Sequence, residues 1–166
     1  MNTFIIILSI VVNFILETTL IPHFRIFQVV PNTGLVLVVV LAILNGKTIG
    51  SLAGLVVGLL QDIMFIPVIG INAFIYFFVG YSVGIAETKL SKDSILLPIL
   101  MTILLTFGYH MVYYIFMYFF NYNLPLSKLL KDVVSIETVC NTIIAIPVFK
   151  LLSKLFITPK ITFGKK

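Results

Sequence analysis

The feature that most constrains this chain is a succession of long apolar segments that contain very few charged residues. Of the 166 residues, 60% are hydrophobic and only 10% are charged, whereas a soluble domain carries roughly 25% charged residues. A surface of this composition suits a hydrocarbon solvent better than water. Because each crossing of a bilayer takes about 20 residues, the sequence predicts an all-α, polytopic membrane protein with about six transmembrane helices.

The expected helices cover most of the chain, and they lie at residues 4–21, 33–44, 48–66, 69–86, 95–120 and 133–156. The second is short for a full crossing. It spans either if it starts near Ile26 and includes Pro31, or if the bilayer thins around it. Pro31 followed by Asn32 instead favours a helix that starts at this point. We expect one six-helix transmembrane domain over residues 1–157 and a short basic cytoplasmic tail over 158–166.

The distribution of basic residues predicts how the chain is oriented, because cytoplasmic loops are enriched in lysine and arginine. With the N-terminus inside, eight lysines lie on the inner side and three basic residues lie on the outer side. We therefore expect a multi-pass protein with both termini in the cytoplasm. The net charge of +5 does not indicate a nucleic-acid partner, since the basic residues are not gathered on a soluble face.

Small residues recur every four positions along the third expected helix. The stripe consists of Gly46, Gly50, Gly54 and Gly58, and it ends at Asp62. This spacing places the residues on one face of a helix, where another helix backbone can approach closely. Gly80 and Gly84 offer a matching face on the fourth helix. We expect these six glycines to serve helix packing or the binding of a partner helix.

The same region resembles a known family. Pro31-Asn32, the apolar run, the glycine stripe ending in Asp62, Gly70-Ile71-Asn72-Ala73 and Val79-Gly80-Tyr81 with Gly84 are similar to the rod shape-determining protein MreD family. The resemblance covers about Pro31 to Gly84. It implies a non-enzymatic scaffold of wall elongation in the bacterial plasma membrane. It also implies binding to the single-span shape protein MreC and, through MreC, links to MreB filaments, a RodA-type polymerase and a transpeptidase.

Several polar side chains fall inside the expected helices, where an ionisable residue costs about 2.5 to 3.5 kcal/mol. They are Asn13, Glu17, Asp62, Asn72, His110, Glu137 and Asn141. In the predicted orientation they collect in the outer half of the membrane, which indicates a polar cavity open to the outside. Hydration of Glu17 and Glu137 at the interface is the alternative. Pairing of His110 with a carboxylate would neutralise both groups, but the sequence does not identify the partner.

The competing interpretation is a transporter subunit. Six short helices, tight loops and an outward polar cavity also resemble the substrate-binding component of energy-coupling-factor vitamin transporters. Such a site needs converging aromatic and polar groups, and the chain offers Tyr113, Tyr114 and Tyr118 but no tryptophan. Proton transport is disfavoured because the inner half lacks polar groups. We expect no enzyme, cofactor or metal site, since the chain has one cysteine, two distant histidines and no H-E-x-x-H motif.

Overall fold

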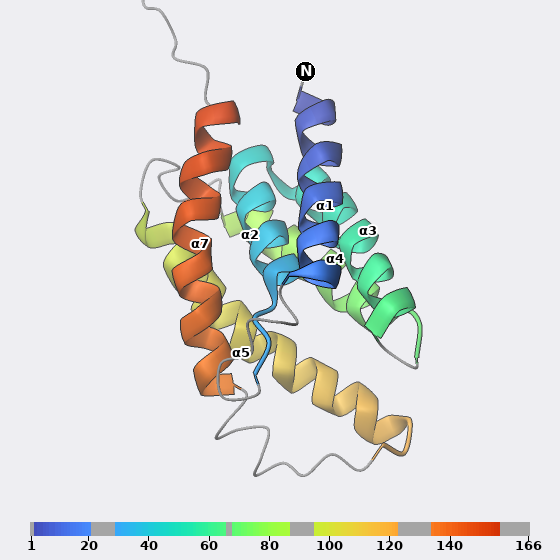
Figure 1. The fold of residues 1–166 in the computed structure, drawn as a ribbon. Helices are drawn as coiled ribbons and strands as arrows, with labels where there is room; N and C mark the ends of the chain where they lie inside the picture. Colours follow the sequence, from blue (N-terminus) through green and yellow to red (C-terminus); the bar gives the residue numbers. More distant parts are fainter. Residues whose placement is uncertain (1, 21–28, 66–67, 87–94, 123–133, 157–166) are drawn as a thin grey trace, which may run out of the picture.

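The computed structural model describes residues 2–20, 29–65, 68–86, 95–122 and 134–156, and most of these residues are helical. The helices are α1 (Asn2–Thr19), α2 (Thr33–Asn45), α3 (Lys47–Phe65), α4 (Ile71–Ala86), α5 (Leu96–Phe119) and α7 (Val134–Phe156) (Figure 1). The predicted all-α class is confirmed, and the helix ends differ from the expected ones by no more than two residues. The predicted tail lies outside the described residues.

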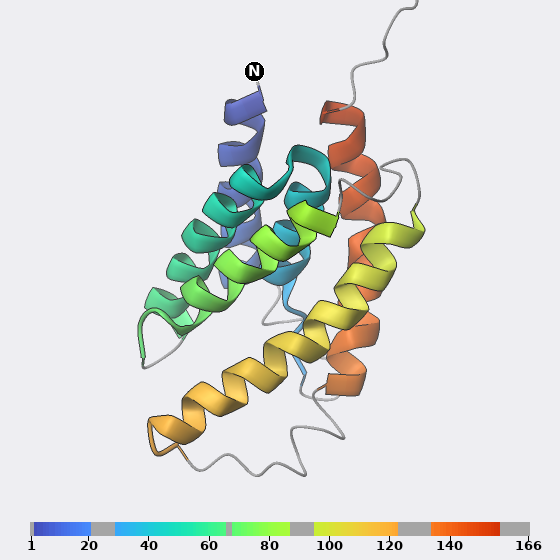
Figure 2. The same cartoon turned by 180° about the vertical axis from the view of Figure 1, so that it is seen from behind.

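The two ends of the described chain lie at the same end of the helix bundle. Figure 1 shows the start of α1 and the end of α7 together, and the turn between α2 and α3 also lies there. We call this the terminal end and the opposite end the distal end. Successive helices run in alternating directions between the two ends (Figures 1 and 2), as expected for a chain that crosses a membrane repeatedly.

Helix α2 is the core of the bundle. Its residues from Thr33 to Ile43 are all buried, which is typical of a helix that is apolar on every side. The expectation that it might begin near Ile26 is wrong, because the helix starts at Thr33. Pro31 has no backbone N–H and disfavours a helical conformation at Val30. Thirteen residues span only about 20 Å, but the surrounding helices shield α2 from the bilayer.

Three of the described helices are long and apolar enough to cross a membrane by length and composition. They are Lys47–Phe65, Leu96–Phe119 and Ile136–Phe156, whereas α1, α2 and α4 are shorter apolar helices. Large apolar side chains are exposed on all the outer helices, as Ile7, Leu52, Leu104 and Leu151 illustrate. Such a surface is suited to lipid contact, and it agrees with the predicted membrane protein.

The glycines of α3 lie directly against the backbone of α4. A Cβ atom added to Gly54 would lie 2.1 Å from the carbonyl oxygen of Tyr76, and one added to Gly58 would lie 2.5 Å from the backbone nitrogen of Ala73. Real Cβ atoms do not approach other atoms so closely. The two helices therefore pack backbone to backbone, and glycine is required along this seam.

The same packing continues to the terminal end of the α3–α4 seam. A Cβ at Gly80 would lie 2.1 Å from the carbonyl oxygen of Gly50, and one at Gly84 would lie 2.2 Å from the Cα atom of Lys47. Gly46 lies outside α3, since it ends α2 with a φ of 82°, a conformation that favours glycine. All six predicted glycines thus serve contacts or turns within the chain.

Candidate functional site

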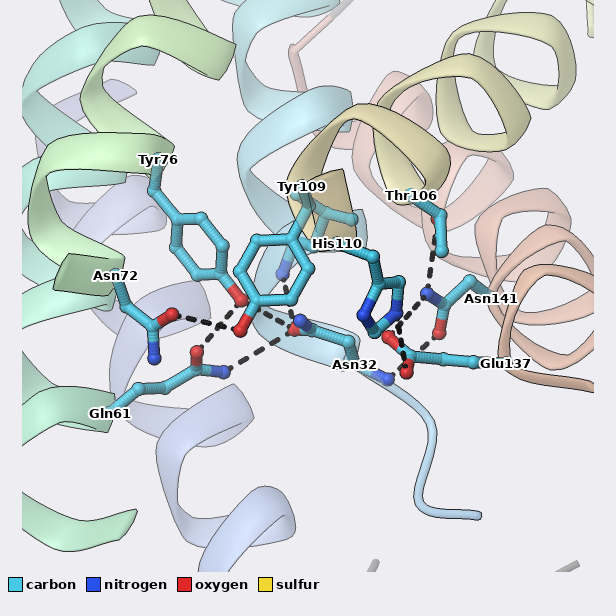
Figure 3. Close-up of polar contacts among 10 residues, drawn as sticks. Asn32, Gln61, Asn72, Tyr76, Thr106, Tyr109, His110, Glu137 and Asn141 are labelled. Carbon is cyan, nitrogen blue, oxygen red and sulfur yellow. Dashed lines mark hydrogen bonds and ion pairs between the residues drawn. The ribbon is translucent and has the colours of Figure 1, made fainter. Parts of the chain in front are cut away.

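Buried polar side chains from all six described helices or their caps meet in the distal half of the bundle. Figure 3 shows most of them, and they are Asn32, Gln61, Asn72, Tyr76, Thr106, Tyr109, His110, Glu137 and Asn141. Glu17 of α1 joins the same cluster. We call these ten residues the polar network. An unpaired buried polar group is costly, so the partners of each group determine what the network can do.

Asn32 is the centre of this network. Its side-chain oxygen accepts the backbone N–H of Leu35 at 3.0 Å and the phenol of Tyr76 at 2.7 Å. The first bond caps the start of α2, a role for which asparagine is strongly preferred. The backbone N–H of Asn32 donates to Oδ1 of Asn141 at 2.8 Å. The residue that follows Pro31 therefore ties α2 to α4 and α7 at one point (Figure 3).

Gln61 connects α1 to this centre. Its Nε2 donates to Oε1 of Glu17, and its Oε1 lies 2.8 Å from the phenol oxygen of Tyr76. Asn13 is only at the edge of the cluster, with its Nδ2 3.5 Å from Oε2 of Glu17. Glu17 is buried between helices, so the structure does not support the alternative in which its carboxyl group is hydrated at the membrane surface.

His110 and Glu137 form a buried pair between α5 and α7. Nε2 of His110 lies 2.9 Å from Oε2 of Glu137, so the structure identifies the carboxylate that the sequence left open. Asn141 donates to Oγ1 of Thr106 at 3.2 Å and to Oε1 of Glu137 at 3.4 Å. The pair is thus connected to Asn32 through Asn141, and removal of one partner would leave the other uncompensated.

Asp62 caps the start of α4 and is not one of the ten residues of the polar network. Its carboxylate accepts the backbone N–H groups of Gly70 at 2.9 Å, Asn72 at 2.9 Å and Ala73 at 3.0 Å. The negative charge and the three bonds both suit the start of α4, where backbone N–H groups lack helical partners. Asn72 accepts the phenol of Tyr109 at 2.9 Å. Asp62 therefore fixes the α3–α4 connection.

Sequence reasoning missed several members of the network. Asn32 was considered only as part of a helix start, while Gln61, Tyr76 and Tyr109 were not predicted as site residues. These residues do carry a signal, because each places a polar atom within or beside an apolar segment. Gln61 precedes Asp62 and Tyr109 precedes His110 in the sequence. The missed residues carry neutral groups, which the high cost of an ionisable residue in a membrane does not single out.

The polar groups bond to one another, and the groove that the structure describes shares only Tyr109 with the polar network. It is a space of about 370 Å³ between α4 and α5, lined by Phe74, Ile75, Phe78, Val79, Ser82, Leu105, Gly108, Tyr109 and Val112. Most of this lining is apolar, unlike the polar cavity expected from the sequence. Among the described residues, no three histidine, cysteine or acidic side chains are grouped so that they could hold a metal ion. The polar network is therefore an arrangement that joins helices.

Comparison with known proteins extends the resemblance seen in the sequence. The sequence model of the rod shape-determining protein MreD family matches residues 1–155, whereas the motifs that carry the resemblance cover only about residues 31–84. No curated protein and no solved structure matches the chain. The family match includes all the helices that contribute to the polar network. Because the match covers most of its length, the chain belongs to the MreD family of rod shape-determining proteins.

Proposed function

We propose that this rod shape-determining membrane protein is a non-enzymatic scaffold of the bacterial wall-elongation machinery. It binds the single-span shape protein MreC and, through MreC, links MreB filaments to a RodA-type polymerase and a transpeptidase. The family match over residues 1–155 is the single observation that carries this proposal. The geometry of the bundle adds support of a different kind, because it concerns what the buried polar groups are used for.

The polar groups of the bundle are used for fastening helices together. The carboxylate of Asp62 is occupied by three backbone N–H groups, and the carboxylate of Glu137 contacts His110 and Asn141. A scaffold needs helices that hold fixed positions, and buried networks whose groups are satisfied give such rigidity. These contacts therefore favour a protein that presents faces to partners over one that uses the same residues for chemistry.

We further propose that the protein lies in the plasma membrane of a bacterium and that its terminal end faces the cytoplasm. Lys47 is the first residue of α3, and Lys150 and Lys154 lie near the end of α7. The start of α3 and the end of α7 both lie at the terminal end (Figure 1). Basic residues are enriched on the cytoplasmic side. A reporter that is active only in the cytoplasm, fused after Lys166, is expected to be active. Activity of an external reporter alone would contradict this orientation.

The proposal is tested by purifying the tagged chain from its native membrane in mild detergent and identifying the proteins that accompany it by mass spectrometry. We expect recovery of a single-span shape protein together with wall polymerase or transpeptidase. An unrelated multi-pass protein with the same tag serves as the control. Recovery of a paired ATPase module in place of these proteins would contradict the scaffold and favour the substrate-binding component of a transporter.

A further inference from the structure

One glycine in the bundle lacks the neighbour that the other helical glycines have. The helical glycines with another residue within 3 Å of an added Cβ atom are Gly34, Gly50, Gly54, Gly58, Gly80 and Gly84. At Gly108, in the middle of α5, an added Cβ would meet nothing within 4 Å. Glycine in a helix interior is about 1 kcal/mol less favourable than alanine. Nothing in the described part of the chain requires glycine at this position.

Gly108 lies in the groove between α4 and α5, two helices that run alongside each other in Figure 2. The α4 wall carries Phe74 and Phe78, whose side chains are 49% and 48% exposed. From Phe74 to Ser82 this wall is about 12 Å long. Tyr109 also lines the groove, and its hydroxyl donates to Oδ1 of Asn72. The groove is therefore mostly apolar, and no side chain fills it at Gly108.

Small residues line both walls of the groove, Gly108 on α5 and Ser82 on α4. The Ser82 hydroxyl already donates to the carbonyl oxygen of Phe78 at 2.7 Å, so it does not require a polar partner. In lipid, helices associate through close van der Waals packing, and small residues allow their backbones to approach. A flexible lipid tail can fill an apolar groove whether or not residue 108 carries a Cβ atom. A rigid helix can approach α5 more closely because this Cβ atom is missing.

The surface beside the groove extends this apolar contact along α5. Leu104, Met111 and Ile115 are all more than half exposed, and they lie close to Gly108 and Val112 in the helix. A transmembrane helix is about 30 Å long and therefore exceeds the 12 Å of the groove itself. Such a helix could lie in the groove near Gly108 and continue along the exposed side of α5. The shape of this surface thus fits a long rigid rod.

We propose that the α4–α5 groove is the docking surface for the transmembrane helix of a partner protein. The matching helix presents a glycine, alanine or serine opposite Gly108 and apolar side chains to Phe74 and Phe78. This inference rests on the proposed function, which supplies a partner with a single transmembrane helix. It adds to that function the face on which the partner binds.

The test uses the full-length protein in its native membrane, with the single-span partner followed by co-purification. Gly108→Leu fills the groove and is expected to lower partner recovery about tenfold. A tenfold change corresponds to about 1.4 kcal/mol, which is within the usual cost of an overpacked contact. Leu55→Phe adds bulk on the exposed side of α3 and is the matched control. Both variants should elute as folded protein in the same amount as the wild type, because an added Cβ at Gly108 meets nothing within 4 Å and the Leu55 side chain is 42% exposed.

A second readout does not depend on a disrupted contact. A photoreactive benzoylphenylalanine at Phe78 should crosslink to the partner, whereas one at Leu8, which is similarly exposed on α1, should crosslink only to lipid. If the wild type recovers the partner, but Gly108→Leu binds it equally well and Phe78 crosslinks only to lipid, the groove assignment is wrong and the scaffold proposal stands. If the wild type recovers no single-span partner, both proposals fail.

Discussion

The two sides of helix α4 show how differently the same type of residue can be used. On the α3 side, glycines allow backbone to touch backbone, as Gly54 does at Tyr76. On the α5 side, Phe74 and Phe78 line a groove together with Gly108, where an added Cβ would meet nothing within 4 Å. A glycine in a membrane helix therefore need not have a close neighbour within its own chain, and at Gly108 we propose that the neighbour is the partner helix.

The seams also differ in how they are held. The α3–α4 seam is closed along its length, and Asp62 caps its distal end with three hydrogen bonds. The α4–α5 seam is held mainly toward its distal end, where Tyr109 bonds to Asn72 and the rings of Phe74 and Phe116 lie 5.5 Å apart. We infer that the first seam is part of the rigid frame and the second is available for binding.

The largest effect is expected from Gly54→Leu, which would break the closed seam. The new side chain overlaps the backbone of Tyr76, and neither helix can move without separating other close contacts. We expect a loss of more than about 3 kcal/mol in the free energy of unfolding, measured by denaturant titration in mixed micelles. The matched control is Gly108→Leu, which should be at least as stable as the wild type. Wild-type stability of Gly54→Leu would refute backbone contact at this seam.

A smaller but clear effect is expected from Asp62→Ala at the distal end of the same seam. Three backbone N–H groups lose their acceptor, and one lost cap or one buried unsatisfied donor costs about 1 to 2 kcal/mol. We expect a destabilisation of about 2 to 3 kcal/mol in the same titration. Asp62→Asn keeps one acceptor oxygen and should lose less. Equal stability of the two variants would show that the carboxylate oxygens do not cap α4.

Tyr109→Phe tests the bond that holds the open seam. The substitution keeps the ring in the groove and removes the hydroxyl that donates to Asn72. We expect a loss of about 1 kcal/mol, the usual contribution of one intramolecular hydrogen bond. Tyr113→Phe is the control on the same helix, and it should leave the thermal unfolding temperature unchanged. A larger loss for the control would mean that the seam is held elsewhere.

The smallest effect, and the one opposite in sign, is expected for Gly108→Ala. Because an added Cβ meets nothing within 4 Å, the methyl group should fit and reduce the freedom of the unfolded chain. Such changes stabilise by about 0.4 to 1 kcal/mol. Gly50→Ala is the control, since its Cβ would lie 2.5 Å from that of Ala42, and it should destabilise. Destabilisation by Gly108→Ala would indicate an internal neighbour at the groove.

Much of the fold follows from local physics and could be predicted. Apolar segments of sufficient length determine the helices, and Pro31 with Asn32 determines where α2 begins. The four-residue spacing of glycines also indicated a packed face. The sequence could not show that α2 is enclosed by the other helices, because an apolar helix in lipid and one inside a bundle have the same composition.

The candidate site was only partly predictable, because it depends on which helices meet. His110 and Glu137 are separated by 27 residues, and no spacing rule connects them. Asp62 was grouped with the other polar residues, but the chain reversal after α3 brings it to the first N–H groups of α4. The α4–α5 groove depends on how far two helices stand apart, which is set by the shapes of side chains across the seam.

The most direct test of the account compares the open seam with and without a partner. In a background where Cys140, the only cysteine, is replaced by alanine, a nitroxide label at Phe78→Cys reports contact with oxygen dissolved in the lipid. The account predicts high oxygen accessibility for the protein alone and a marked decrease when the single-span partner is reconstituted with it. A label at Leu8→Cys on α1, which is similarly exposed, should stay accessible in both cases. Unchanged accessibility at Phe78 with the partner bound would contradict the account.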